Sequence, residues 1–319
     1  MSRLALLAAL IALAPTPLVL AGRHPTVIAK PVPLDPADPG RLDLGRLTYL
    51  GGWVLRGGDR RFGGVSSMTF QGDRLVMLSD GGVVTSFRFK GSGPVADYAM
   101  SELPDGPGDG SRKVDRDSES STYDPVSGHV WAGFETTNQI WRYTSGFAKA
   151  DGHAAPAAMA DWPGNEGAEA MARLRDGRFL VFAETKKRED GSHFALLFPG
   201  DPTEGAKPVV FGYRGPKGFA VTDAAQLPDG RVMLLHRRFS ITAGFAAALT
   251  IIDPNQIRPG EDVTGEPVAR LAPPLTVDNM EALAISQSGG RIIVWIASDD
   301  NYFVAERTLL LAFALKPGT

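Results

Sequence analysis

The sequence of 319 residues contains no cysteine, and it has neither a basic block nor the pattern of a long amphipathic helix. Without cysteine, no disulfide bond stabilises the chain and cysteine-based catalysis is excluded. Lys and Arg number 33 against 36 Asp and Glu, a formal net charge of -3. A nucleic-acid partner would require a clustered cationic face, so we predict none.

Several catalytic motifs are also missing. The chain has no Gly-x-Ser-x-Gly elbow, no His-Glu-x-x-His pair, no Gly-rich phosphate loop and no dinucleotide fingerprint. These absences argue against a serine hydrolase of the elbow type, a zinc hydrolase and a nucleotide-binding enzyme.

Apolar residues form one run near the start of the chain. Arg3 supplies a positive charge, residues 4–14 are apolar, and a small-x-small signature ends at Ala21. Pro15 and Pro17 leave the run shorter than the ~20 residues that a spanning helix needs. We therefore expect residues 1–21 to be a signal peptide cleaved after about Ala21, with no stable membrane insertion afterwards and a periplasmic or secreted mature protein.

The rest of the chain is rich in turn signals. It contains 37 glycines and 24 prolines. Residues 22–44 are rich in Pro, Asp and Gly and predict an extended N-terminal lead-in, and residues 45–319 predict a single domain. In that domain, short segments rich in Val, Ile, Leu, Phe and Trp alternate with Asp-Gly, Ser-Gly and Gly-Gly pairs, which is typical of β-hairpins.

An internal repeat organises these segments. Each copy has a small or acidic first residue, an apolar strand, a tight turn and a second apolar strand, and the copies begin at Ser67, Glu119, Glu169, Asp223 and Glu281. Their spacing of 50 to 58 residues suits propeller blades, whose period is roughly 40–50 residues before loop insertions. We predict an all-β fold, a single β-propeller of five to six four-stranded blades. The sixth could lie in the insertions around 200–220 or 253–276. A β-sandwich is the alternative, but it would not need such a repeat.

The two ends of the domain predict how the ring closes. Residues 46–55 are strand-like and precede the first repeat, and about three strands remain after Glu281. An open sheet would expose an edge. We therefore expect the N-terminal strand to pair with the last blade.

Four of the five copies begin with a carboxylate. Equivalent positions in successive blades surround one axis, so these side chains would repel one another unless a cation, a proton or basic groups compensated. A divalent cation held by oxygen ligands, Ca²⁺ above all, is the natural partner. A structural role, accepting N–H bonds from the next blade, is the alternative for each carboxylate. The predicted metal ligands are Glu119, Glu169, Asp223, Glu281, Asn165, Asp278 and Asp300.

Several segments carry a resemblance to a known family. Asn165-Glu-Gly-Ala-Glu169-Ala-Met is similar to an Asn-x-Gly-x-Glu-Gly-Leu element, and Asp278-Asn-Met-Glu281 with Ser298-Asp-Asp300-Asn is similar to a C-terminal signature. The stretch from Thr222 to Ser240 resembles the family's Asp-containing blade, with His236 where that blade has Glu. Together they resemble the esterase-like domain of the phytase family over about residues 46–316. The resemblance implies a propeller that hydrolyses esters or phosphoesters.

The predicted function joins these observations. Glu169, Asp223 and Glu281 would act as metal ligands or general bases, and Arg237 would neutralise substrate charge on a small-molecule ester or phosphoester. Bridging the carboxylate ring is an equal alternative for Arg237. Few other basic residues are available, which argues against phytate itself. A non-catalytic periplasmic binding or scaffold module and a gluconolactonase-like lactone hydrolase remain open, the latter favoured by Asn165, Asn279 and Asn301. We expect a monomer.

Overall fold

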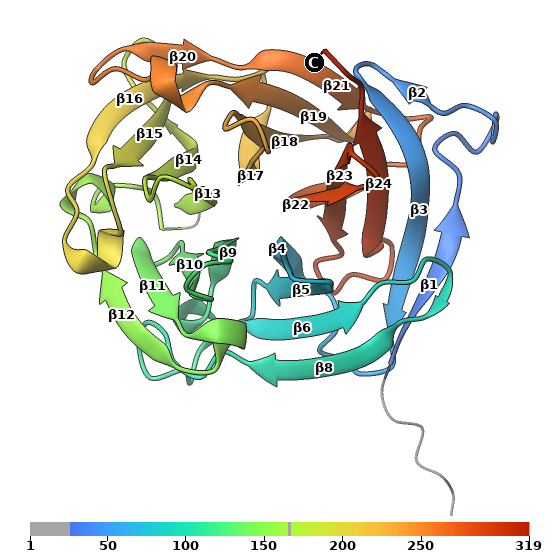
Figure 1. Ribbon diagram of the computed structural model, residues 1–319, viewed down its shortest axis with the longest axis horizontal. Helices are drawn as coiled ribbons and strands as arrows, with labels where there is room; N and C mark the ends of the chain where they lie inside the picture. Colours follow the sequence, from blue (N-terminus) through green and yellow to red (C-terminus); the bar gives the residue numbers. More distant parts are fainter. Residues whose placement is uncertain (1–25, 165–166, 319) are drawn as a thin grey trace, which may run out of the picture.

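The computed structural model describes residues 26–164 and 167–318, so the predicted signal peptide lies outside the described residues. The strands of this part form five separate sheets around a common centre (Figure 1). The first sheet contains β4 (Val65–Gln71), β5 (Arg74–Ser79), β6 (Val83–Arg88) and β8 (Ala96–Glu102). The second contains β9 (Ser118–Tyr123), β10 (Val130–Phe134), β11 (Gln139–Tyr143) and β12 (Ala150–Ala154). The third sheet contains β13 (Ala168–Arg173), β14 (Phe179–Lys187), β15 (His193–Phe198), β16 (Val209–Arg214) and β20 (Asp262–Thr264). The fourth contains β17 (Ala220–Gln226), β18 (Val232–Ser240), β19 (Gly244–Ile252) and β21 (Glu266–Leu271).

The fifth sheet has seven strands and joins both ends of the domain. It contains β22 (Asn279–Ser288), β23 (Arg291–Asp299), β24 (Leu309–Leu315), β3 (Leu47–Gly57), β1 (Val27–Val32), β7 (Gly93–Pro94) and β2 (Asp43–Leu44). β3 pairs antiparallel with β24, from Leu47 opposite Leu315 to Val54 opposite Leu309. The predicted closure by an N-terminal strand is confirmed, and residues 27–32 of the lead-in add a further strand, β1.

The five inner strands form a closed ring. β4 contacts β9, β9 contacts β13, β13 contacts β17, β17 contacts β22, and β22 contacts β4 again. The all-β class and the propeller arrangement are therefore confirmed, whereas a sandwich would have two facing sheets. The segments in which a sixth blade was considered contribute β16, β20 and β21 to sheets already present, which makes one blade five-stranded.

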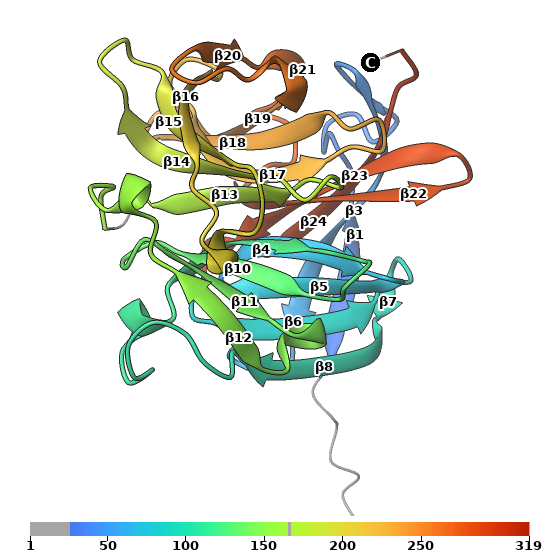
Figure 2. The same ribbon diagram turned by 60° about the vertical axis from the view of Figure 1, so that its left-hand side comes forward.

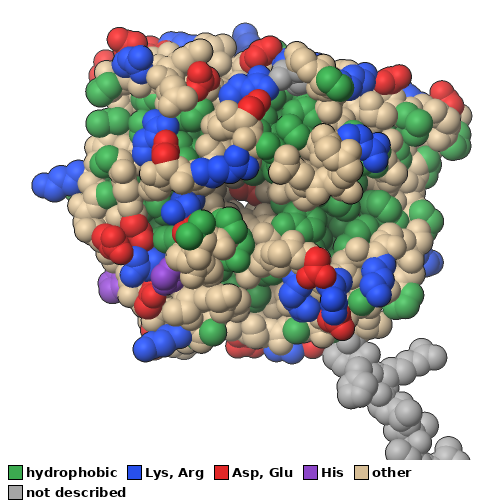
Figure 3. Space-filling model, in the orientation of Figure 1, with side chains coloured by type: hydrophobic (Ala, Val, Ile, Leu, Met, Phe, Trp, Pro, Cys, Tyr) green, Lys and Arg blue, Asp and Glu red, His purple; other side chains and the backbone are tan. Residues whose placement is uncertain are grey.

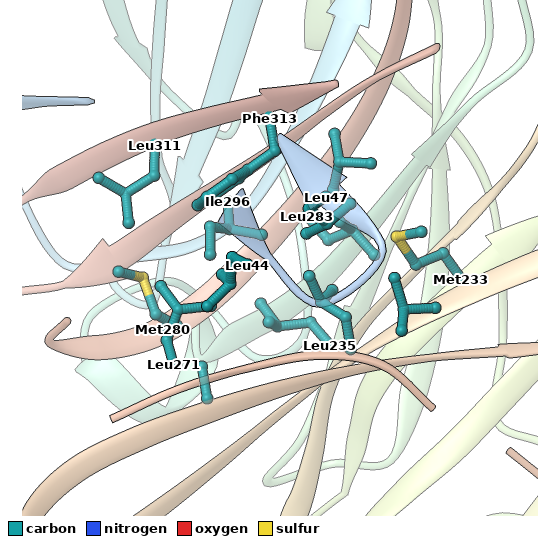
Figure 4. Packing of buried hydrophobic residues seen from close by; sticks show 14 of the residues in the cluster. Leu44, Leu47, Met233, Leu235, Leu271, Met280, Leu283, Ile296, Leu311 and Phe313 are labelled. Atoms are coloured by element: carbon teal, nitrogen blue, oxygen red, sulfur yellow. The ribbon is translucent and has the colours of Figure 1, made fainter. Parts of the chain in front are cut away.

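Apolar side chains between neighbouring blades form the core. Figure 4 shows Leu283, Ile296 and Phe313 of the seven-stranded sheet facing Met233 and Leu235 of β18, all of them buried. Full burial of one such side chain contributes about 1.5–3 kcal/mol. The central ring is thus held by packing between sheets, not by hydrogen bonds within any single sheet.

Tight turns end the inner hairpins. β22 and β23 are joined by Gly289 and Gly290, with φ of 56° and 73°, the left-handed region that a two-residue turn of this kind requires. The hairpin projects from the body of the molecule (Figure 2). Within the described residues, the structure has no helix of the length and apolarity needed to cross a bilayer.

Candidate active site in the central channel

A β-bulge lies near the start of each inner strand, and in three blades its extra residue is a glutamate that lines the central cavity. In β9, Ser118 pairs with Phe134 and Ser120 with Gly133, so Glu119 between them is the extra residue. A bulge re-aims the side chain of its extra residue. The same one-residue shift occurs in all five blades, and the equivalent extra residues are Ser66, Glu119, Glu169, Thr222 and Glu281.

The second strand of each blade supplies another ring. In each second strand, the residue that pairs with the inner strand just before its bulge, such as Phe134 in β10, is followed directly by one polar residue. In the five blades these polar residues are Asp80, Glu135, Glu184, Arg237 and Asp299. Three carboxylates of the first ring and four of the second therefore meet at one end of the axis.

These rings border a cavity of about 490 Å³. Figure 3 shows a hollow at the centre of one face of the molecule. The described residues that line the cavity include nine carboxylates and two basic side chains. They are Asp80, Asp117, Glu119, Glu135, Glu169, Glu184, Glu281, Asp299 and Glu306, with Lys113 and Arg237. Carboxylates thus exceed cations by seven.

Three of the carboxylates form a compact oxygen cluster. Asp117, Glu119 and Glu135 each offer an oxygen, and these oxygens lie within 4.8 Å of one another. Thr136 donates a hydrogen bond to Asp117 at 3.0 Å. Lys113 Nζ lies 3.8 Å from Asp117 but only 2.6 Å from Asp80. An all-oxygen donor set of this charge suits a hard divalent cation.

The carboxylates perturb one another. Burial raises the pKa of Glu135 to about 8, and repulsion from Asp117 adds to the effect. Burial, followed by repulsion from Glu135, raises the pKa of Glu119 well above its ordinary value. Burial also raises the pKa of Asp299 to about 7. The cluster therefore favours any positive partner, a proton or a metal ion, over its fully ionised empty form.

Arg237 connects the two rings electrostatically. Its guanidinium lies 2.9 Å from Glu184 and 2.8 Å from Glu281. Burial raises the pKa of Glu281 to about 8, and the charge of Arg237 acts in the opposite direction. A cation committed to two carboxylates holds them in place, which is the bridging role that the sequence left open.

Asp223 lies outside the lining of the cavity. The extra residue at the bulge in β17 is Thr222, and a shift of one residue along a strand sends a side chain to the other face. Asp223 instead accepts hydrogen bonds from the backbone N–H of Leu283 at 2.6 Å and of Ala224 at 2.8 Å. The bond from Leu283 connects β17 to β22. The sequence repeat aligned Asp223 with the three glutamates, but the residue equivalent to them at the bulge is Thr222, one position earlier.

Two other predicted ligands also lie outside the cavity lining. Asp278 is paired with Arg307 at 3.0 Å. Asp300 accepts hydrogen bonds from the backbone of Gly64 at 2.9 Å and from Thr308 at 2.8 Å. Through these contacts the β23–β24 connection, which contains Asp300 and Arg307, is bound to the segment before β22 and to the segment before β4. Asn165 lies outside the described residues.

The His236 position has a structural explanation. Its ring is buried and contacts the Tyr213 hydroxyl at 2.7 Å and the Ala248 carbonyl at 3.2 Å. The equivalent position in the second ring is the next residue, Arg237.

Sequence reasoning missed Asp80, Glu135 and Glu184. A signal was present, because an acidic residue lies at or near the end of the second strand in four of the five repeats, as in Ser79-Asp80, Phe134-Glu135 and Ala183-Glu184. Only the register between the two strands shows that these positions are equivalent.

A comparison with protein families matches residues 60–302 to the phytase-like family, described as esterase-like activity of phytase. The chain belongs to this family. The match includes every acidic residue of the cavity except Glu306. No protein of curated function matches the sequence.

Solved structures with similar folds are distant from this member of the phytase-like family. A putative gluconolactonase has 11% identity and a TM-score of 0.47, with 90% of this chain and 93% of that chain covered. Glutaminyl cyclase from Myxococcus xanthus has 10% identity and a TM-score of 0.47, with 79% and 90% covered. Hydrazine synthase from Kuenenia stuttgartiensis has 12% identity and a TM-score of 0.38, with 76% of this chain and 58% of that chain covered. At these values the similarities carry no functional argument.

Proposed function

We propose that the protein is an exported hydrolase of small esters or phosphoesters that binds a divalent cation, Ca²⁺ above all, in the central channel. The observation that carries the proposal is the Asp117, Glu119 and Glu135 cluster within a cavity that has seven more carboxylates than cations. Like charges taken out of water are stable only with a compensating partner, and oxygen ligands in this number suit Ca²⁺.

Each group in the cavity has a distinct task in this proposal. Asp117, Glu119 and Glu135 would hold the cation, which when bound supplies Lewis-acid polarisation of the scissile carbonyl or phosphoryl oxygen. Glu169 is buried and lines the same cavity as Glu135. It would take a proton from the attacking water and return it to the leaving oxygen. Arg237 keeps Glu184 and Glu281 in place.

The test measures turnover and metal content together. Purified protein is assayed with p-nitrophenyl acetate and p-nitrophenyl phosphate, before and after treatment with EDTA and again after Ca²⁺ is restored. We expect activity to fall at least tenfold on chelation and to return with Ca²⁺. Glu135→Gln should lower both activity and the metal stoichiometry found by elemental analysis.

Glu261→Gln, a surface substitution far along the chain from the cavity segments, is the matched control and should change neither value. Stoichiometric metal without turnover on either substrate would favour the non-catalytic binding module. Turnover that EDTA leaves untouched would contradict the metal assignment.

A further inference from the structure

Large apolar side chains gather at the mouth of the acidic cavity. Of the ten large hydrophobic side chains exposed in the described residues, six belong to three segments that also line or adjoin the cavity. They are Val114, Phe239, Ile241, Tyr302, Phe303 and Val304. Val114 follows cavity-lining Lys113, and residues 302–304 lie between cavity-lining Asn301 and Glu306. Such concentration around one opening marks a binding surface.

The β18–β19 hairpin brings apolar surface directly against the acidic floor. Side chains two residues apart share a face of a strand, and Arg237 and Phe239 both line the cavity. Phe239 pairs across the hairpin with Phe245, and their ring centroids are 4.8 Å apart. Although it lines the cavity, Phe239 is 58% exposed. Strand pairing continues to Ser240 and Gly244, so the aromatic pair is held in position before any ligand arrives.

The β23–β24 connection, a second segment of the rim, is fixed in a similar way. The Asp300 carbonyl accepts a hydrogen bond from the Phe303 N–H at 2.7 Å, and Asn301 donates to Glu306 at 2.8 Å. Asn301 and Tyr302 both have positive φ, 47° and 50°, so the chain turns sharply here. The turn leaves Phe303 and Val304 at its tip, 58% and 98% exposed.

We infer that Phe239 and Phe245 select a carboxylic ester with an apolar acyl or alkyl chain, in preference to a phosphate ester. This inference rests on the proposed hydrolase function and assigns its substrate class. Lys113 and Arg237, the two basic residues of the described cavity lining, are already paired with carboxylates, so a dianionic phosphate would find no unpaired cation there and would meet repulsion from the carboxylates that remain ionised. An uncharged ester meets none, and its chain gains contact with the aromatic pair. Each methylene removed from water stabilises the complex by about 0.8 kcal/mol, up to about fourfold in affinity.

The test compares substrates of increasing chain length. The values of kcat/KM are measured for p-nitrophenyl acetate, butyrate, hexanoate and phosphate with the wild type, Phe239→Ser and Ile28→Ser. Ile28 lies on β1, is also exposed, and does not line the cavity. We expect hexanoate to exceed acetate at least tenfold in the wild type and in Ile28→Ser. Phe239→Ser should reduce that ratio at least fivefold, and phosphate should be the poorest substrate throughout.

A binding measurement separates this inference from the hydrolase proposal. Calorimetric titration with octan-2-one and butan-2-one, uncharged ketones that cannot be hydrolysed, should show tighter binding of the longer ketone. Phe239→Ser should remove that difference. If no substrate turns over but this difference is present, the hydrolase proposal fails and the apolar rim remains a ligand site. Turnover with equal values for all acyl chains and equal ketone binding would overturn the rim assignment. Phe239-dependent flotation with neutral phospholipid vesicles, without chain selectivity, would likewise overturn it and assign the rim to a membrane surface.

Discussion

At the scale of single residues, the structure separates carboxylates that hold the fold from those that face the cavity. Asp223 and Glu169 both lie on inner strands and both are buried. Asp223 satisfies two backbone donors, whereas Glu169 lines the cavity among other carboxylates. The difference comes from one residue of register at the bulge.

Asp223→Ala should therefore affect stability and leave metal binding intact. The substitution leaves the N–H groups of Leu283 and Ala224 without this acceptor, and an unpaired buried donor costs about 1–3 kcal/mol. We expect a loss of about 2 kcal/mol or more in the free energy of unfolding, measured with urea, and unchanged Ca²⁺ stoichiometry. Asp229→Ala, at a surface turn, is the control. Loss of bound Ca²⁺ in the folded Asp223→Ala protein would show that Asp223 is a ligand after all.

His236 gives the fold a sensitivity to acid. Burial lowers the pKa of His236 to about 3, against an ordinary value of about 6.5. Between these values the unfolded chain binds a proton that the folded chain does not, so this residue's contribution to stability is lost as the pH falls from 6.5 towards 3. The slope approaches about 1.4 kcal/mol per pH unit.

The prediction is checked by urea unfolding at several pH values between 7 and 4. His236→Gln should unfold with a smaller dependence on pH than the wild type, while His153→Gln, altered at an exposed position, should match the wild type. The carboxylates respond to acid in both proteins, so the difference isolates His236. Identical slopes for all three proteins would contradict the assignment.

At the scale of elements, the bulge and the strand register place the site. The repeated pattern predicted the inner strands and the closing strand because hydrophobic alternation and turn residues are local signals. It could not predict that Thr222, not Asp223, is the extra residue at the bulge of β17, since a bulge shows only in the pairing between strands. For the same reason Glu135 and Glu184 were missed, although Glu135 directly follows one strand that was predicted and Glu184 lies within the structure's extension of another.

Gly133→Ala tests how far the inner ring depends on this register. A Cβ at Gly133 would lie 2.4 Å from Ser120 Oγ and 3.0 Å from the Ala168 carbonyl oxygen. Those two atoms share a hydrogen bond of 2.6 Å that joins β9 to β13 next to Glu119 and Glu169. We expect a loss of about 1–3 kcal/mol in the free energy of unfolding. Gly200→Ala, whose nearest neighbour would be the Ala206 Cβ at 4.0 Å, should be nearly neutral in the same urea titration.

At the scale of the whole molecule, the ring arrangement concentrates charge. Each blade brings one or two polar side chains to the axis, and five blades bring the cavity nine carboxylates together with residues of the connecting loops. Packing between the sheets holds these groups together against their repulsion. Stability and cation binding should therefore be coupled through the same residues.

Glu135→Gln should show this coupling as a reversal of sign. Without divalent cations the variant lacks one of the repelling carboxylates and should melt at a higher temperature than the wild type. With Ca²⁺ the order should reverse, because a cation present at 100 times its Kd adds about 2.7 kcal/mol only to a protein that binds it. Differential scanning calorimetry in EDTA and in Ca²⁺ measures both halves, with Glu261→Gln as the control. If Glu135→Gln shifts the melting temperature in the same direction in both conditions, the carboxylates do not share one cation, because a common ligand must be unfavourable when the ion is absent and favourable when it is bound.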